Sequence, residues 1–125
     1  MTAETGTEKK DRLIRELAMH IGSECCFRHW TGRLVYTEGV QFLAREARAY
    51  WLIDLATSWM LDPRVGREEF VVWKLTVKPD HTAIAIADDG NGNELARQVI
   101  EYTDFPLEEI SLYLTNSTLL LPSEY

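Results

Sequence analysis

The chain has 125 residues, of which 46% are hydrophobic and 26% charged, a balance typical of a folded globular domain. This composition excludes a disordered polymer or a fibrous repeat, and the formal net charge of −7 argues against a nucleic-acid or anionic-membrane partner. We therefore expect a single domain over residues 1–125 with a disordered tail over about residues 1–7.

The acidity is concentrated in the last third of the chain. Residues 1–60 carry eight acidic and eight basic side chains, residues 61–87 carry four of each, and residues 88–125 carry eight acidic side chains against Arg97 alone. All of the net negative charge thus lies after residue 87. This distribution fits one negative patch and equally fits charges scattered over the surface.

The ends and the cysteines predict a cytoplasmic protein. The first twelve residues are polar, unlike a signal peptide, and no window holds 18 uncharged apolar residues. Cys25 and Cys26 are adjacent, and a bridge between neighbours needs a strained ring, so reduced thiols are expected. One of the two thiols is expected to be buried as a small hydrophobic side chain and the other to lie at the surface. The alternative is that one cysteine acts as a nucleophile near His29.

The first predicted helix runs from Glu8 to Ile21 and is capped by Thr7. Its apolar side chains form one stripe on an otherwise charged helix: Leu13, Ile14, Leu17, Ala18 and Ile21. Gly22 and Ser23 are expected to end it. Thr31 and Gly32 then supply a turn before an extended segment at residues 34–36.

The second predicted helix begins at Glu38, after the cap Thr37, and continues through residue 61 with a bend near Ala49. Residues 49–61 are apolar on nearly every side except Asp54, which marks this segment as the central helix. Pro63 breaks the helix, and residues 62–69 are expected to form a loop.

From residue 70 the apolar pattern changes to the period of two that is typical of strands. In the segment 70–78, Val71, Trp73, Leu75 and Val77 alternate with a more polar face that includes Val72. Residues 82–87 and 94–102 are predicted strands joined by the glycine-rich hairpin loop 88–93.

A short helical turn is expected over residues 104–107, because Pro106 suits a helix start and Glu108 and Glu109 favour its positive end. Residues 110–121 follow as a hairpin around Asn116 and Ser117. The fold class is α+β, with N-terminal helices packed on an antiparallel β-meander with a C-terminal hairpin.

Several sequence blocks together carry a family resemblance. They are FRHWTGRLVYTEGV, AYWLID, VWKL, YTDFPLEEI and LLLPSEY. The chain resembles, from about Cys26 onward, a family of small uncharacterised bacterial proteins often found on plasmids, phages and other mobile elements. The resemblance brings no catalytic or ligand residues. Length, acidity and a mobile-element origin are also similar to those of small inhibitors of host defence systems, including anti-CRISPR proteins, by analogy of size and charge alone.

The densest cluster of recognition-type side chains lies within nine residues of the sequence. It consists of Arg28, His29, Trp30, Arg33 and Tyr36. Aromatic rings and guanidinium groups give large contacts at modest entropy cost, so the cluster suits a binding surface. The alternative is that Trp30 and Tyr36 complete the core while the arginines pair with the acidic last third. Catalysis by His29 is a third possibility, although no partner for acid–base chemistry is evident.

A second candidate surface is an acidic and aromatic stretch near the C-terminus. Its binding residues are Tyr102, Asp104, Glu108 and Glu109, with Phe105 beside them. As a negative patch with aromatic anchors it suits a basic protein surface. The alternative is a solvated edge whose rings pack inward. Trp51, Trp59 and Trp73 are expected in the core.

Metal and cofactor sites are not expected. Residues 89–93 alternate oxygen ligands like the start of an EF-hand loop, but Glu94 stands where that loop requires glycine. A hairpin turn in which glycine and asparagine adopt positive φ explains the same residues without a metal ion. His20, His29 and His81 lack partners at zinc-ligand spacing.

The leading hypothesis is a small acidic non-enzymatic protein-interaction module. Its expected role is inhibition of a basic host protein, such as a nucleic-acid-binding defence component. The first alternative is a small-ligand binder or small enzyme with a pocket between helices and sheet near His29. The second alternative is a structural homodimer in which Val/Leu-rich strands pair edge to edge.

Overall fold

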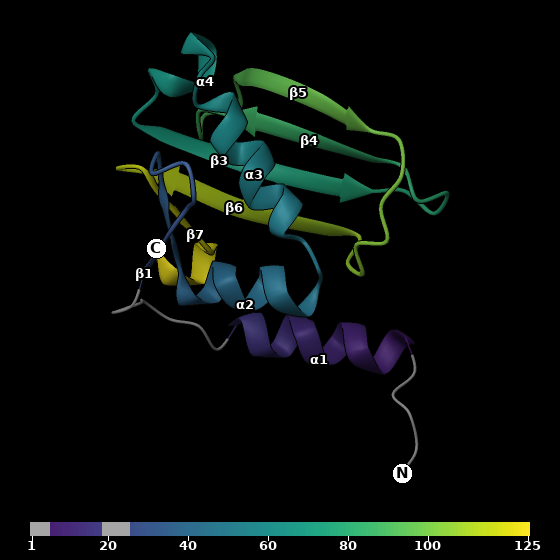
Figure 1. Ribbon diagram of the computed structural model, residues 1–125. Coiled ribbons are helices and arrows are strands. Elements are labelled where there is room, and N and C mark those ends of the chain that lie inside the picture. The colour runs from purple at the N-terminus through teal and green to yellow at the C-terminus, as the bar shows by residue number, and fades with distance from the viewer. Residues whose placement is uncertain (1–5, 19–25) are drawn as a thin grey trace.

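The protein is a layer of helices on a mixed sheet, seen in a computed structural model that describes residues 6–18 and 26–125 (Figure 1). In chain order the elements are α1 (Gly6–Ala18), β1 (Cys26–Arg28), β2 (Val35–Thr37), α2 (Glu38–Glu46), α3 (Tyr50–Trp59), α4 (Pro63–Gly66), β3 (Phe70–Val77), β4 (Ala83–Asp88), β5 (Glu94–Ile100), β6 (Glu109–Thr115), β7 (Thr118–Leu120) and a 3₁₀ turn (Pro122–Glu124). The predicted α+β class is confirmed.

The strands form one sheet in the order β1-β2-β7-β6-β3-β4-β5. The meander β3-β4-β5 and the hairpin β6–β7 are antiparallel, as predicted. The sheet is nevertheless not a simple meander, because β6 returns to the free side of β3 and β2 pairs with β7 in parallel. A parallel pair needs a long crossover, and the helices between β2 and the later strands provide it.

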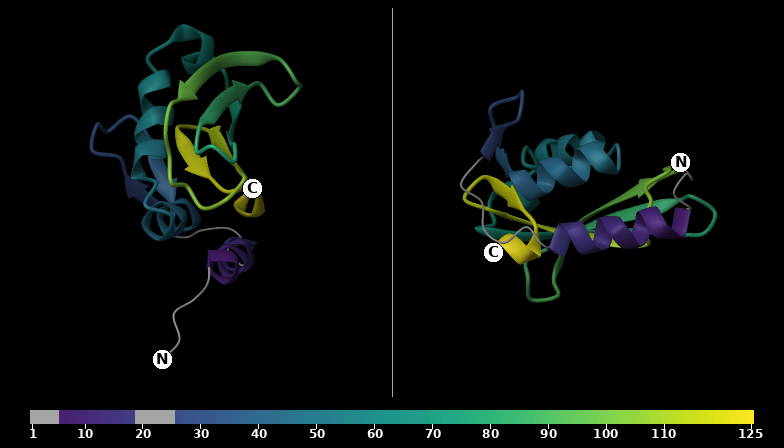
Figure 2. Two further views of the ribbon diagram at one scale, coloured as in Figure 1. Left: turned by 90° about the vertical axis from the view of Figure 1, so that its right-hand side faces the viewer. Right: turned by 90° about the horizontal axis from the view of Figure 1, so that it is seen from below.

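The core lies between α3, α2 and one face of the sheet (Figure 2). The predicted alternation in β3 is confirmed, with Val71, Trp73 and Leu75 buried and Lys74 on the exposed face. Trp73 is fully in the core. Trp51 and Trp59 are partly buried and pack against it, so the tryptophans expected in the core belong there.

Both predicted hairpin turns are present. In the β4–β5 turn, the Asp89 carboxylate accepts hydrogen bonds from the backbone N–H groups of Asn91 and Asn93 and from the Asn93 amide. In the β6–β7 turn, Asn116 and Ser117 have φ of 51° and 54°. Positive φ at both central residues matches the twist of an antiparallel pair, which explains the asparagine at residue 116.

The start of the chain differs from the prediction. Helix α1 already includes Gly6 and Thr7, so the predicted tail is wrong at these residues and Thr7 is not a cap. Of the stripe residues whose burial the structure describes, Leu13 and Leu17 are buried, whereas Ile14 is half-exposed. The expected end of the helix, from Ile21 to Ser23, lies outside the described residues. No helix in residues 6–18 or 26–125 is long and apolar enough to cross a membrane.

The predicted second helix is two helices, and the loop after it holds a third. Thr37 caps α2, as expected, by accepting a hydrogen bond from the Val40 N–H. Arg48 has a φ of 53°, which ends the helical path and turns the chain into α3 at Tyr50. After Asp62 the chain forms the single turn α4, because Pro63 fits a first helical position.

The helical turn expected over residues 104–107 is wrong. This segment forms bends and extended chain, and β6 begins only at Glu109. Thr103, Phe105 and Leu107 are buried while Asp104 is exposed, an alternation of period two that a helix does not permit. Burial of these side chains therefore outweighs the local preference of Pro106 for a helix start.

The Asp62 carboxylate, which caps α4, is expected to make stability depend on pH. The Asp62 carboxylate accepts hydrogen bonds from the side chain and backbone of Arg64, which lower its pKa from 3.8 to about 2. A lowered pKa in the folded state stabilises the fold above pH 3.8, and this contribution is lost as pH falls through about 2. An NMR titration of the Asp62 carboxyl is expected to show this low midpoint in the wild type and a midpoint closer to 3.8 in Arg64→Ala. Equal midpoints in the two proteins would contradict the pairing.

Candidate binding cavity beside the β1–β2 hairpin

The β1–β2 hairpin is fastened to α3 by one buried histidine. His29 is 5% exposed, and its Nε2 lies 2.6 Å from Oδ1 of Asp54. Its Nδ1 lies 2.8 Å from the Thr31 hydroxyl and accepts the Thr31 backbone N–H at 3.2 Å. Figure 2 shows the hairpin standing out from the body of the molecule next to α3.

These contacts determine the neutral tautomer of His29. Nδ1 accepts the Thr31 backbone N–H and therefore carries no proton, so the ring proton is on Nε2 and is donated to Asp54. Both ring nitrogens are engaged inside the protein. The arrangement orients the hairpin and the carboxylate, and it leaves the ring no free nitrogen for a substrate.

The hairpin and the start of α3 carry several aromatic rings that are exposed or partly exposed. The Trp30 side chain is 84% exposed, although its ring lies 5.4 Å from the His29 ring and its Nε1 donates to Asp54 Oδ1 at 3.4 Å. Phe27 and Tyr36 are directly opposite in the β1–β2 pair and stack with ring centroids 5.7 Å apart. The first residue of α3, Tyr50, is also exposed.

The hairpin and α3 enclose a cavity of about 290 Å³ between them. Its lining residues are Arg28, His29, Trp30, Tyr36, Tyr50, Ile53 and Asp54. Burial raises the pKa of Tyr36, and the neighbouring Tyr50 and Asp54 raise it further. The phenol of Tyr36 therefore stays protonated over a wider pH range than usual and can donate a hydrogen bond inside the cavity.

The structure brings together most of the first predicted cluster. Arg28, His29, Trp30 and Tyr36 line one cavity, whereas Arg33 lies in the exposed turn outside it. The alternative placed Trp30 and Tyr36 in the core. It is wrong for Trp30, whose ring is in solvent, whereas Tyr36 is partly buried and packs against the core. Within residues 6–18 and 26–125, neither Arg28 nor Arg33 pairs with an acidic side chain.

Sequence reasoning missed the residues that α3 contributes. Tyr50, Ile53 and Asp54 are spaced i, i+3 and i+4 and therefore share one helix face. Asp54 is the acidic residue of an otherwise apolar helix, and that isolation was the available signal. Its distance of 25 residues from His29 concealed the pairing.

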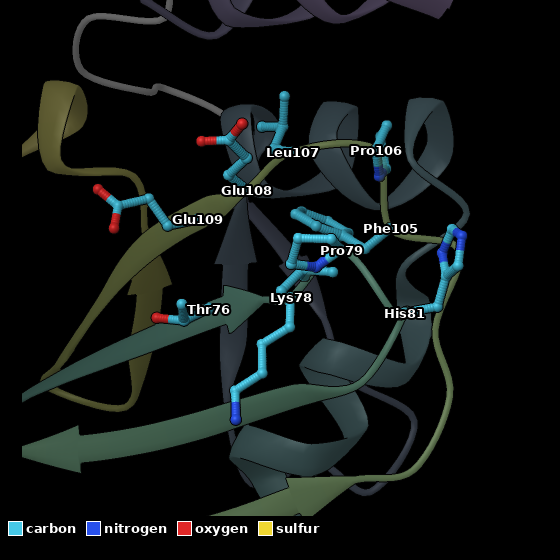
Figure 3. A pocket seen from close by; sticks show the side chains of 10 residues that line it. Thr76, Lys78, Pro79, His81, Phe105, Pro106, Leu107, Glu108 and Glu109 are labelled. Atoms are coloured by element: carbon cyan, nitrogen blue, oxygen red, sulfur yellow. The ribbon is translucent and has the colours of Figure 1, made fainter.

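The second predicted cluster lies at another place. A cavity of about 660 Å³ opens between the end of β3, the following turn and the segment before β6. Figure 3 shows Phe105 and Pro79 at its centre, with His81 on one side and Glu108 and Glu109 on the other. Tyr102 and Asp104 lie outside its lining. Tyr102 packs on the His81 ring at 5.7 Å, and Asp104 borders a smaller cavity of about 170 Å³ with Lys9 and Arg48 among its lining residues.

The acidic side chains of the last third do not form one patch. Asp88, Asp89 and Glu94 lie at one end of β5, and Glu101 to Glu109 follow its other end (Figure 1). Glu108 pairs with Lys10 at 3.3 Å, and Glu109 pairs with Lys74 at 3.4 Å. Glu124 turns inward and accepts from the Thr37 hydroxyl and the Gly39 N–H.

The remaining sequence candidates gather no site in the described part of the chain. Cys26 is exposed and forms no disulfide with a described residue, whereas Cys25 and His20 lie outside the described residues. Among residues 6–18 and 26–125, no three histidine, cysteine or acidic side chains are placed to share a metal ion.

The buried position of His29 makes a stability prediction. In His29→Ala the Nε2 bond to Asp54 and the Nδ1 contacts with Thr31 are lost and a small void remains. We expect the free energy of unfolding to fall by about 2 kcal/mol, measured by urea denaturation. Arg33→Ala, an exposed change in the same hairpin, is the control with an expected effect within about 0.5 kcal/mol. Equal stability of His29→Ala and wild type would show that His29 does not hold the hairpin to α3.

Comparisons with known proteins identify a family of unknown function and no relative with a described activity. A family model matches residues 11–125 of the chain, and that family is described as one of unknown function. The search of curated proteins finds no match. The search of solved structures likewise finds none.

Proposed function

The chain belongs to the family of unknown function DUF6876, and we propose that it is a protein-interaction module that binds its partner through the β1–β2 hairpin. The observation that carries this proposal is the 84% exposure of Trp30 on a hairpin that His29 holds against α3. An exposed tryptophan offers a partner a large apolar contact area, and tryptophan dominates the energetics of many protein interfaces.

The side chains at this place supply a surface for binding. Both nitrogens of His29 bond protein groups, Asp54 and Thr31, so the ring serves to hold the hairpin on α3. The exposed rings of Phe27, Trp30 and Tyr50 instead supply contact area for another surface. The net charge of −7 and the exposed Asp54 carboxylate suit a basic partner.

The proposal is tested by capture of partners on the tagged full-length chain at low and moderate salt, with identification by mass spectrometry. A protein retained by the wild type and lost with Trp30→Ala supports it. Charge reversal of Glu108 and Glu109 to lysine tests the second surface in the same experiment. A partner lost with this reversal and kept with Trp30→Ala would move the interface to the end of the sheet near β6.

A small-ligand binder is the second candidate function, and the cavity of about 290 Å³ beside His29 favours it. It lies at the small end of the size range of ligand pockets. Saturable NMR shifts of Tyr36 and Tyr50 with a metabolite mixture, in the absence of any protein partner, would favour this candidate over the first.

The homodimer alternative needs different strands from those expected. The Val/Leu-rich strands β3 and β6 are paired on both sides, so they offer no free edge. Among the described strands the edges are β1, which is three residues long, and β5, which exposes Glu94, Arg97, Gln98 and Val99. Short or charged edges discourage strand addition. Light scattering after size exclusion measures the oligomeric state directly, and a dimer formed by pairing of the described strands would have to use β1 or β5.

A further inference from the structure

The cavity beside the hairpin combines one carboxylate with a set of aromatic rings. Asp54 is 56% exposed at the side chain, and Trp30, Tyr36 and Tyr50 stand around it on the cavity wall. The negative faces of aromatic rings attract cations, most strongly for tryptophan and then tyrosine. A carboxylate at the same place adds a full negative charge to that attraction.

The carboxylate is both oriented and available. Its Oδ1 accepts the His29 Nε2 proton and the Trp30 Nε1 proton, which fix the direction of the group. Its Oδ2 accepts no hydrogen bond from the described residues, so this oxygen is free to accept one from a ligand. The neighbouring Tyr36 has a raised pKa and is neutral, so it offers a polar group without a competing charge.

One arginine, Arg28, also belongs to the cavity wall. Arg28 pairs with Val35 in the hairpin, and Phe27 pairs with Tyr36 one position earlier, so the Arg28 side chain starts from the strand face opposite Tyr36. The wall therefore carries one guanidinium group and one carboxylate, and the carboxylate is the group that stands with the aromatic rings of Trp30 and Tyr50.

We propose that this cavity seats a cationic side chain, lysine or arginine, of the protein partner, with the ammonium or guanidinium group on Asp54 Oδ2 and its stem against Trp30, Tyr36 and Tyr50. The inference rests on the proposed function. It adds the chemical group on the partner that the cavity recognises. The cavity of about 290 Å³ holds one such side chain and its contacts.

The test uses the full-length ¹⁵N-labelled protein and four small probes: the Nα-acetyl amides of lysine, arginine, glutamine and glutamate. We expect the lysine and arginine probes to shift the Trp30 indole N–H and the Asp54 amide with saturation in the millimolar range, and the neutral and anionic probes to leave them in place. Saturable binding of the glutamate probe that is lost in Arg28→Ala would overturn the proposal, because the cavity would then recognise an anion.

Asp54→Asn is the sharpest variant, because asparagine keeps an oxygen that accepts from His29 and Trp30 and removes only the charge. We expect it to bind the cationic probes about tenfold more weakly than the wild type, and Arg33→Ala to bind them as the wild type does. Equal binding by Asp54→Asn and wild type would overturn the role of the carboxylate.

Failure of this inference is distinguishable from failure of the proposed function. If Trp30→Ala loses the protein partner and Asp54→Asn retains it fully, the hairpin is the interface and the cationic seat is wrong. If both variants retain the partner, the hairpin itself is not the interface, and the proposed function fails with it.

Discussion

The Trp30→Ala variant is expected to bind the protein partner at least 30-fold more weakly than the wild type, a loss of about 2 kcal/mol or more. The Trp30 ring is 84% exposed in the free protein, and Asp54 and His29 fix its orientation. Nearly the whole ring surface can therefore be buried by a partner on binding. Calorimetry or surface plasmon resonance with the identified partner measures the difference.

Thermal unfolding separates this effect from a folding defect. Because the Trp30 ring is in solvent, the free energy of unfolding of the variant is expected to stay within about 0.5 kcal/mol of the wild type. Trp30→Phe keeps a ring without the Nε1 donor and is expected to retain part of the affinity. Unchanged affinity of Trp30→Ala would rule out the hairpin as the binding surface.

The Leu75→Ala variant is expected to lose about 3 kcal/mol of folding free energy. Leu75 is 1% exposed on the central strand β3, and its strand partners on either side are Ala85 and Ile110. Removing a leucine side chain there forfeits its transfer free energy and leaves a void that the paired strands cannot close. Urea denaturation monitored by far-UV circular dichroism measures the change.

Leu61→Ala is the matched control, since it deletes the same atoms at a position that is 64% exposed. Its expected effect on the free energy of unfolding is within about 0.5 kcal/mol. A similar loss in the two variants would mean that Leu75 is not enclosed by the sheet and the helices.

The net charge of the last third does not describe one negative surface. All of the net charge lies after residue 87, but the carboxylates at residues 88–94 and those at residues 101–109 are separated by the full length of β5. Lys10 and Lys74 lie against Glu108 and Glu109 although they are far away in sequence. Exposed pairs of this kind contribute little to stability, and their main effect is to reduce the local negative potential.

Local patterns determined the α+β class, the buried face of β3 and the hairpins at residues 88–93 and 116–117. Each of these depends on near neighbours, namely the period of two in a strand and the tolerance of asparagine and glycine for positive φ. The same patterns located the cluster of Arg28, His29, Trp30 and Tyr36, because these residues lie on one hairpin.

Tertiary structure alone decided how that cluster is used. The pairing of His29 with Asp54 joins residues 25 positions apart, and the parallel pairing of β2 with β7 joins segments from opposite halves of the chain. It also decided that residues 104–107 are extended, because burying Phe105 and Leu107 outweighs the local helix signal of Pro106. Local propensities are worth tenths of a kcal/mol per residue, whereas a buried large side chain is worth about 2 kcal/mol, so long-range packing determines the outcome wherever the two disagree.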